Sequence, residues 1–184
     1  MDQAQVEAIA VRQIDPGERL LWSGTPSPGE AASAALPGTL IGVPFTAFAA
    51  FWMWSAWSIA PHAAGPFRFF PLFGIPFMVI GLGMVLAPLW ASLRARNTVY
   101  ALTERRALII VDGVGGGISS YARADMGELT RTERVDGRGS VFFAIRTSTT
   151  SRGFVKHTRV GFIGIPDVRN VERLIREHVL GQAA

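Results

Sequence analysis

The sequence predicts an α+β membrane protein: a seven-stranded, partly open β-barrel capped by a C-terminal helix, with a two-helix transmembrane hairpin inserted after the first strand. Three observations predict this fold class. Only 17% of the 184 residues are charged, and residues 31–93 contain a single formal charge, Arg68. Short strand-like segments separated by turn residues recur after Arg96. An amphipathic helical pattern follows them from Pro166 onward.

The uneven charge distribution also predicts the domain organisation. Outside residues 31–93, 121 residues carry 31 of the 32 charges, which matches the quarter typical of soluble domains. A chain that is 49% hydrophobic and has no cysteine is neither disordered nor a disulfide scaffold. We expect an N-terminal cytoplasmic segment with a short helix and the first strand (1–34), the transmembrane hairpin (35–93) and a cytoplasmic domain with the C-terminal helix (94–184).

Two uncharged apolar runs predict the hairpin, one at about 36–60 and the other at about 69–93. Each has about 25 residues, and about 20 residues of helix cross the hydrocarbon core of a bilayer. A buried helical hairpin of a soluble protein is the alternative, but its helices would show a polar stripe, and neither run has one. A cleavable signal peptide fits poorly, because the first run begins some 35 residues into the chain without a basic flank.

Tryptophans mark the two ends of the predicted hairpin. Trp52, Trp54 and Trp57 cluster near the end of the first run, and Trp90 lies near the opposite end of the second. Because amphipathic rings favour the headgroup region, we expect these four residues to be membrane-interface anchors. Gly81 and Gly83 could allow close helix approach, although their spacing is not a GxxxG motif.

Basic residues predict the orientation of the hairpin. The loop between the runs offers only Arg68, whereas four arginines follow the second run: Arg94, Arg96, Arg105 and Arg106. By the positive-inside rule, both termini lie in the cytoplasm and the loop lies outside. The same four arginines are candidate contacts for anionic lipid, since headgroups attract each nearby base by about 1 kcal/mol. Topology enforcement alone is the simpler explanation of these charges.

The segment before the hairpin contributes one helix and one strand. Residues 3–12 are expected to form a short helix with Val6, Ile9 and Val11 as its apolar positions. Residues 18–24 read as a strand that stops at a proline-rich break. Because one strand is not stable alone, it must pair with a strand beyond the hairpin.

Six further strands and a helix complete the predicted domain. The strands are expected at 98–102, 106–111, 118–122, 129–135, 140–146 and 159–165. Asp136-Gly137 is a strong hairpin signal, because glycine accepts the positive φ of a tight turn. In the final helix, Asp167 is the expected N-cap and Gly181 the expected stop. Its apolar face comprises Val168, Val171, Leu174, Ile175 and Val179.

Four sequence features together resemble the bacterial pleckstrin-homology (PH) domain membrane proteins. They are Glu18–Gly24 before a proline-rich break, the two-helix insert, the run Tyr100–Ile109, and the pair of turns at Asp136–Gly139 and Ile165–Val168. The resemblance covers residues 17–179 and lies in the order of the parts. It implies a PH-like domain tethered to the bacterial cytoplasmic (inner) membrane by a two-pass hairpin. It implies no catalytic residues.

The sequence nominates no catalytic or cofactor site. His62, His157 and His178 lie on different elements without metal-ligand spacing, and there is no cysteine. The glycine-rich segment 113–117 lacks the GK[ST] ending of a phosphate loop. No nucleophile elbow is present. We therefore expect no metal, no cofactor and no enzymatic activity, and no nucleic-acid partner, because the basic residues come without a reading helix or stacking platform.

These observations favour a non-enzymatic, membrane-anchored adaptor or accessory subunit of a membrane protein complex. It would act through protein–protein contacts of the PH-like domain and the hairpin. The alternative is a sensor of anionic lipid that uses the juxtamembrane arginines. The expected partners are membrane lipids and another membrane protein, and a homo-oligomer stays open. A membrane enzyme is the least favoured class, because no polar residue stands out as its centre.

Overall fold

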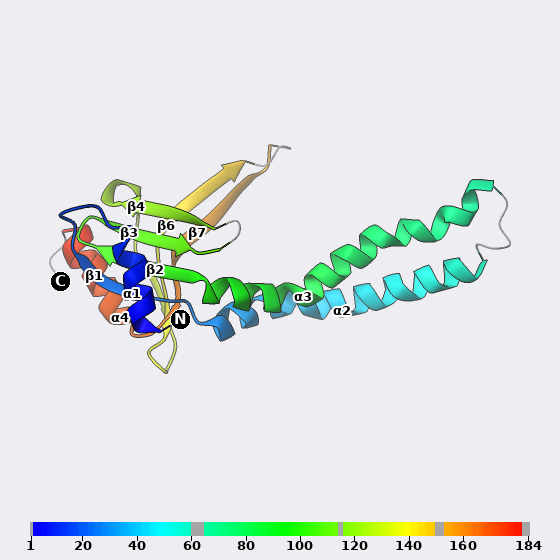
Figure 1. Cartoon of the computed structure of the whole chain (residues 1–184), viewed down its shortest axis with the longest axis horizontal. Helices are drawn as coiled ribbons and strands as arrows, with labels where there is room; N and C mark the ends of the chain where they lie inside the picture. The colour runs from blue at the N-terminus through cyan, green and yellow to red at the C-terminus, as the bar shows by residue number, and fades with distance from the viewer. Residues whose placement is uncertain (1, 60–64, 114–115, 150–152, 182–184) are drawn as a thin grey trace. The chain divides into compact units, whose positions relative to one another are not determined.

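The chain folds into two compact units. A computed structural model describes residues 2–59, 65–113, 116–149 and 153–181. The first unit, called the strand unit here, combines Met1–Pro28 with Arg94–Ala184, and the second, the helical unit, is Gly29–Leu93. The strand unit therefore contains the segments on both sides of the apolar insert (Figure 1).

In the described part of the strand unit, seven strands form two antiparallel sheets. Sheet A has the order β1 (Leu20–Gly24), β2 (Thr98–Thr103), β3 (Arg106–Val111) and β4 (Gly117–Ala122). Sheet B has the order β5 (Thr130–Glu133), β6 (Gly139–Thr149) and β7 (Val155–Ile165). The α+β class and the seven strands are thus confirmed. The strand before the insert pairs with the strand after it, since Trp22 lies opposite Leu102.

Four helical segments lie within the described part of the strand unit, three of them near the ends of the chain. They are α1 (Gln3–Val11), the short 3-10 helix η3 (Arg123–Asp125), α4 (Val168–Leu174) and a closing π-helical turn η4 (Ile175–Val179). A capping box starts α1: the Asp2 side chain accepts from the backbone, and Gln5 accepts from the N–H of Asp2 at 3.2 Å.

The main core lies between the two sheets and the C-terminal helix. The Phe162 ring is its centre, with ring centroids 4.9 Å from Tyr100, 5.2 Å from Phe143 and 5.5 Å from Trp22. The predicted apolar face of the helix closes this core: Val168, Val171, Ile175 and Val179 are buried, and Leu174 is partly buried. Burial of this face against sheet B holds a helix too short to persist by itself.

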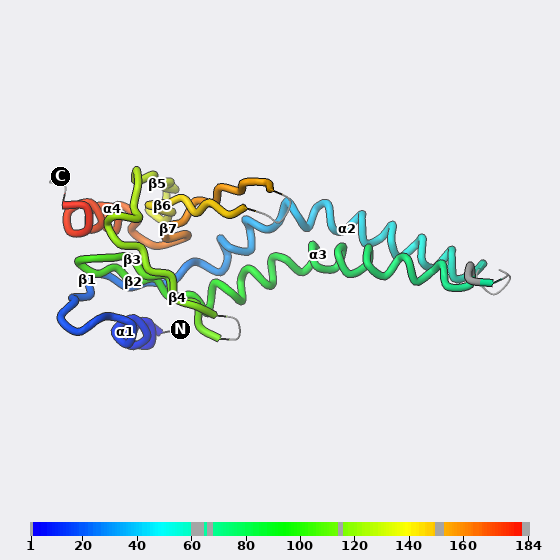
Figure 2. The backbone as a smooth tube through the Cα atoms, turned by 90° about the horizontal axis from the view of Figure 1, so that it is seen from above, coloured from blue at the N-terminus to red at the C-terminus, as the bar shows by residue number. Residues whose placement is uncertain are grey.

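A second core lies on the other face of sheet A. Val6 and Ala10 of α1 pack there with Val99, Ala101, Leu108 and Ile110. Because successive side chains of a strand point to opposite faces, β2 supplies both cores and is buried along its whole length. Figure 2 shows α1 and α4 on opposite sides of this sheet. Val11, which the sequence placed on the apolar face of the helix, is instead exposed.

The backbone at Gly137, Gly181 and Asp167 tests the predicted hairpin turn, helix stop and helix N-cap. Gly137 and Gly181 have φ values of +76° and +62°, as the hairpin turn and the helix stop require. Asp167 does not cap the helix with its side chain. It has φ +49°, and its carbonyl oxygen accepts from the N–H groups of Asn170 and Val171. Asp167 is therefore the N-cap residue, as the sequence predicts, but it caps through its backbone and not through its carboxylate.

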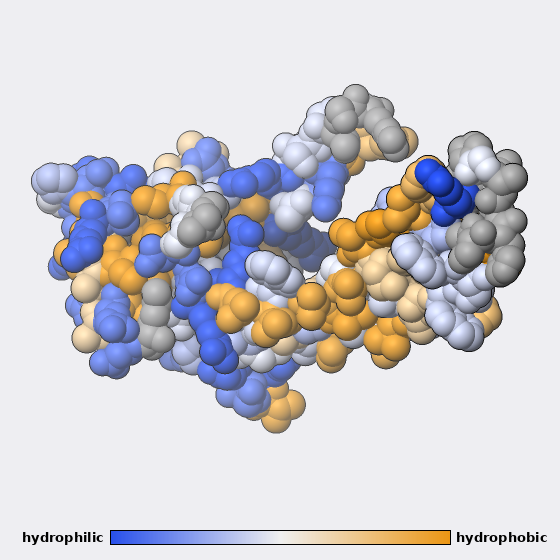
Figure 3. All heavy atoms as spheres, turned by 45° about the vertical axis from the view of Figure 1, so that its right-hand side comes forward, coloured by the Kyte–Doolittle hydropathy of each residue, from blue (hydrophilic) through white to orange (hydrophobic). Residues whose placement is uncertain are grey.

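The helical unit is an apolar hairpin. It contains α2 (Pro28–Ile59), the 3-10 helix η2 (Gly65–Gly74) and α3 (Ile75–Arg96). The first helix begins eight residues before the predicted start, and residues 69–74 of the second run are 3-10 helix. By length and composition, both long helices are sufficient to cross a membrane, with mean hydropathies of 1.6 and 2.2. Figure 3 shows a largely apolar surface on the visible face of these helices.

Candidate interaction sites

The four candidate lipid-binding arginines do not form one cluster. Arg94 and Arg96 are exposed in the last turn of α3. Arg105 and Arg106 follow β2, whose six residues span about 20 Å. The two pairs are thus at opposite ends of this strand. Arg105 is exposed, whereas the side chain of Arg106 is 21% exposed.

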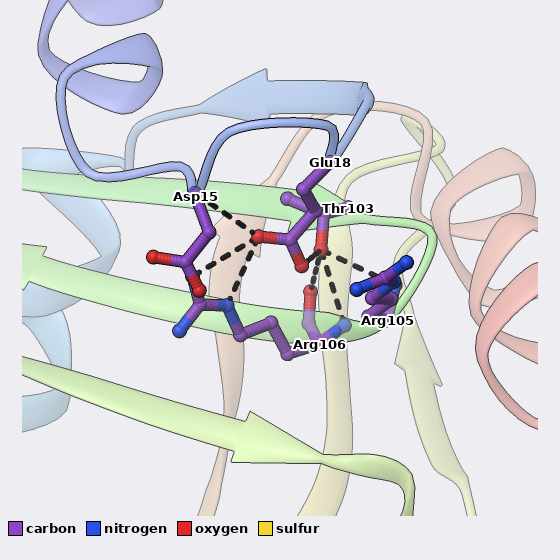
Figure 4. A network of polar contacts seen from close by, with 5 residues as sticks. All are labelled: Asp15, Glu18, Thr103, Arg105 and Arg106. Atoms are coloured by element: carbon purple, nitrogen blue, oxygen red, sulfur yellow. Dashed lines mark hydrogen bonds and ion pairs between the residues drawn. The ribbon is translucent and has the colours of Figure 1, made fainter.

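Arg106 belongs to a polar network that joins the segment before β1 to the β2–β3 turn (Figure 4). Its guanidinium donates to Oε2 of Glu18 from Nε at 3.2 Å and from a terminal nitrogen at 3.0 Å. The same terminal nitrogen lies 2.7 Å from Oδ2 of Asp15. Thr103 donates to Oε1 of Glu18 at 2.6 Å and accepts from the N–H of Arg106 at 3.1 Å. Both carboxylate oxygens of Glu18 are therefore satisfied.

The carboxylate of Glu18 is almost completely enclosed, with 2% of its side chain exposed. Burial acts to raise the pKa of Glu18, but the hydrogen bond from Thr103 and the charge of Arg106 outweigh it. The pKa of Glu18 therefore lies below its ordinary value. This arrangement stabilises an ionised carboxylate and offers no free proton-transfer group, so it serves structure.

The four tryptophans lie on the two long helices. Trp54, Trp57 and Trp90 are exposed, whereas Trp52 is half-buried. The Trp52 ring packs against Phe70, with ring centroids 5.1 Å apart. Trp52 thus holds the helical hairpin together, and the other three rings point away from its interior.

An apolar cavity of about 300 Å³ opens on the helical unit. Its lining consists of aromatic and small residues: Phe45, Phe48, Ala49, Trp52, Phe73, Gly74 and Phe77. The Phe45 and Phe77 rings, 6.2 Å apart, connect its two walls. None of the described residues that line the cavity is charged, so it suits an aliphatic or aromatic group from lipid or from another protein.

Outside the cavity, α2 and α3 pack closely against each other. A Cβ added at Gly81 would collide with Thr46, and one added at Gly42 would lie 2.6 Å from Cβ of Met84. Thr39 donates to the carbonyl oxygen of Met84 at 3.2 Å. Of the two predicted glycines, Gly81 therefore lies in the helix contact, whereas Gly83 faces open space.

The histidines considered as metal ligands do not come together in the described part of the chain. His157 lies on β7 with Nδ1 3.2 Å from the Thr147 hydroxyl, and His178 is exposed in the C-terminal turn. His62 lies outside the described residues. Among the residues that are described, no three histidine or acidic side chains converge to hold a metal ion. Glu133 pairs with Arg131 and Arg169, which links β5 to α4.

Sequence reasoning missed Glu18 and the aromatic cavity. Glu18 stood inside a strand-like motif, and its partner lies 88 residues away, so no local spacing connects them. The cavity residues recur at three- and four-residue intervals in an already apolar run, where helical periodicity does not distinguish them. Comparison of the chain with protein-family models, with curated proteins and with solved structures gives no match.

Proposed function

We propose that this protein is a non-enzymatic, membrane-anchored adaptor or accessory subunit that binds another membrane protein. The main support for this proposal is the exposed apolar surface of the two long helices. Within the most apolar window of each helix, only 11% and 17% of the residues are buried inside the chain. A core helix of a soluble protein would be mostly buried. Apolar surface of this extent needs lipid or protein around it.

The strand pairing supports a two-pass topology. β1 and β2 flank the insert in sequence and pair directly, so both ends of the insert belong to one folded domain. A hairpin that crosses the bilayer twice meets this condition. Arg94 and Arg96 favour a cytoplasmic strand unit by the positive-inside rule. We therefore propose the bacterial inner membrane, with both termini in the cytoplasm.

The order of elements supports a PH-like domain. A four-stranded sheet is followed by a three-stranded sheet and a C-terminal helix that covers the core between them. The N–H of Ser27, just after β1, donates to the carbonyl oxygen of Gly164 on β7 at 3.0 Å and joins the two sheets. Membership of the bacterial PH-domain membrane proteins is part of this proposal.

The aromatic cavity is the proposed contact point for a transmembrane helix of the partner. Its size accommodates a large side chain, and its apolar lining favours entry from within the bilayer. Phe48 lines it and is 66% exposed, whereas Phe51 on the same helix is 62% exposed and does not line it. These two residues form a matched pair for mutation.

Extraction and purification test the proposal. The chain should resist extraction from membranes by alkaline carbonate and should co-purify in mild detergent with one cross-linkable membrane protein. Phe48→Ala should reduce the recovery of that partner, and Phe51→Ala should not. A carbonate-soluble chain, or a lone monomer in mild detergent, would contradict the proposed function.

Recognition of anionic lipid through the arginines is the second candidate. The exposure of Arg94 and Arg96 at the end of α3 favours it. Replacing these two with glutamine should weaken retention of anionic lipid, and the loss should be largest at low salt. Arg105→Gln is the control, because Arg105 is exposed at the opposite end of β2. Unchanged lipid retention in the Arg94 and Arg96 double variant would exclude this candidate.

A further inference from the structure

The two longest strands extend beyond the rest of sheet B as a two-stranded arm. β5 pairs with β6 only as far as Phe142, whereas the pairing of β6 with β7 continues to Thr149 opposite Val155. We define the β6–β7 arm as residues 145–149 with 153–159. Figure 1 shows it projecting from the body of the strand unit. A hairpin of this kind gains little stability alone, so exposed apolar residues on it need an explanation.

The arm combines apolar side chains with positive charge. Ile145, Phe154 and Val155 are exposed, Phe154 by 72%. Arg146, Lys156 and Arg159 are also exposed, and none of these cations has an acidic partner within ion-pair distance in the described part of the chain. Residues 137–166 of the sequence contain no acidic residue.

One end of sheet A carries the connection to the helical unit. Thr98 pairs with Val111, and Val111 pairs with Gly117, so these three residues mark the same end. α3 ends at Arg96, two residues before Thr98. If the helices span a bilayer, this end of the strand unit is tethered at the membrane surface.

The arm extends toward that same end. The Phe143 ring lies 5.6 Å from the ring of Tyr121 on β4. Three residues further along β6, Arg146 donates to the Tyr121 hydroxyl at 2.7 Å and contacts the Ser119 hydroxyl at 3.4 Å. Because Ser119 is closer than Tyr121 to Gly117, β6 runs toward the tethered end as its residue numbers increase.

We propose that the β6–β7 arm binds the surface of an anionic bilayer. Lys156, Arg146 and Arg159 attract the headgroups, and Phe154 with Val155 enters the interfacial layer. A second contact of this kind would fix the rotation of the strand unit on its helical tether. The inference rests on the proposed membrane anchoring. An acidic segment of a partner protein is the competing occupant, but it would not explain why the apolar residues lie on an arm directed at the tethered end.

Fluorescence of the full-length chain in nanodiscs tests the arm. The sequence has no cysteine, so Thr149→Cys places a single environment-sensitive label on the arm. Val135→Cys is the control, because Val135 is fully exposed in the β5–β6 turn at the other end of β6. Each labelled protein is placed in phosphatidylcholine discs with or without about one-third phosphatidylserine. Headgroup-spin-labelled lipid serves as the quencher.

The label at residue 149 should shift to the blue and be quenched in the anionic discs, and the label at residue 135 should not. Arg146→Gln, Lys156→Gln and Arg159→Gln should each lower the ratio of bound to free arm about fivefold. Quenching should also fall at high salt. Phe154→Ser with Val155→Ser should abolish the blue shift while circular dichroism stays unchanged.

Three results would overturn the inference. They are no quenching at residue 149, equal quenching in both lipid mixtures, and protection of the label only when a partner protein is bound. Carbonate extraction separates these failures from failure of the proposed function. A chain that stays in the membrane with an unquenched label disproves only the arm contact, whereas a chain released by carbonate disproves the anchoring itself.

Discussion

Arg106 on β3 donates two hydrogen bonds to Oε2 of Glu18, at 3.0 and 3.2 Å, across 88 residues of sequence that include the whole apolar insert. The backbone supports the same junction, because the N–H of Glu104 donates to the carbonyl oxygen of Arg19 at 3.3 Å. β1 is thereby fixed to β2 and β3 by side chains as well as by strand pairing. The contact joins the segments before and after the insert.

Glu18→Gln should destabilise the strand unit. The substitution removes a charge that is enclosed with its partner, and hydrogen bonds to charged groups contribute about 1.5–3 kcal/mol. The free energy of unfolding, measured by chemical denaturation in mild detergent, should fall by about that amount. Arg105→Gln is the matched control at the exposed neighbouring arginine and should change the stability by less than about 0.5 kcal/mol. Equal effects of the two variants would contradict the role of the ion pair.

Acid should weaken the same junction. The pKa of Glu18 is lower in the folded chain than in the unfolded one, so its contribution is fully present above the ordinary value of 4.5. That contribution is lost as the pH falls from 4.5 through the folded pKa. Glu133 also has a lowered pKa, because Arg169 donates to it, and it acts in the same direction. Thermal unfolding between pH 7 and pH 3 should therefore show a smaller acid loss in Glu18→Gln, and identical pH profiles would argue against this assignment.

Val6→Asp should damage the second core. Val6 is 2% exposed beneath sheet A, and an unpaired carboxylate there should lower the unfolding free energy by about 2–4 kcal/mol. Val11→Asp changes the same helix at a position that is 55% exposed and should have little effect. Thermal denaturation followed by circular dichroism compares them. A tolerated Val6→Asp would mean that α1 is not needed to cover the sheet.

Gly81→Leu should loosen the helical hairpin. A side chain at this position collides with Thr46 on α2, and overpacking of a tight contact costs about 1–3 kcal/mol. Gly83→Leu is the control two residues away, where no atom lies within 4 Å of the added Cβ. Titration with a denaturing detergent should unfold the Gly81 variant first. Coincident transitions for the two variants would show that the close approach at Gly81 contributes nothing.

The elements with a strong local signal were predictable. The near-absence of charge between residues 31 and 93, where Arg68 is the single charged residue, identifies the helical insert, and alternating apolar residues identify the strands. The apolar face of the C-terminal helix is buried as its spacing predicts, from Val168 to Val179. The extension of β6 to Thr149 was not predicted, because polar residues such as Thr147 and Ser148 carry no burial pattern.

The sequence by itself determined that an apolar helical insert interrupts a chain of ordinary charge content, and it determined the order of the elements. Charge content and apolar periodicity are local properties, so they can be read without the fold. Only the tertiary structure decided which residues meet. It separates Arg106 from Arg94 and pairs it with Glu18, covers sheet A with α1, and directs the β6–β7 arm toward the end of sheet A at which Thr98 follows α3. These contacts depend on strand order and register, which bring together residues that are far apart in the sequence. No local sequence pattern therefore reveals them.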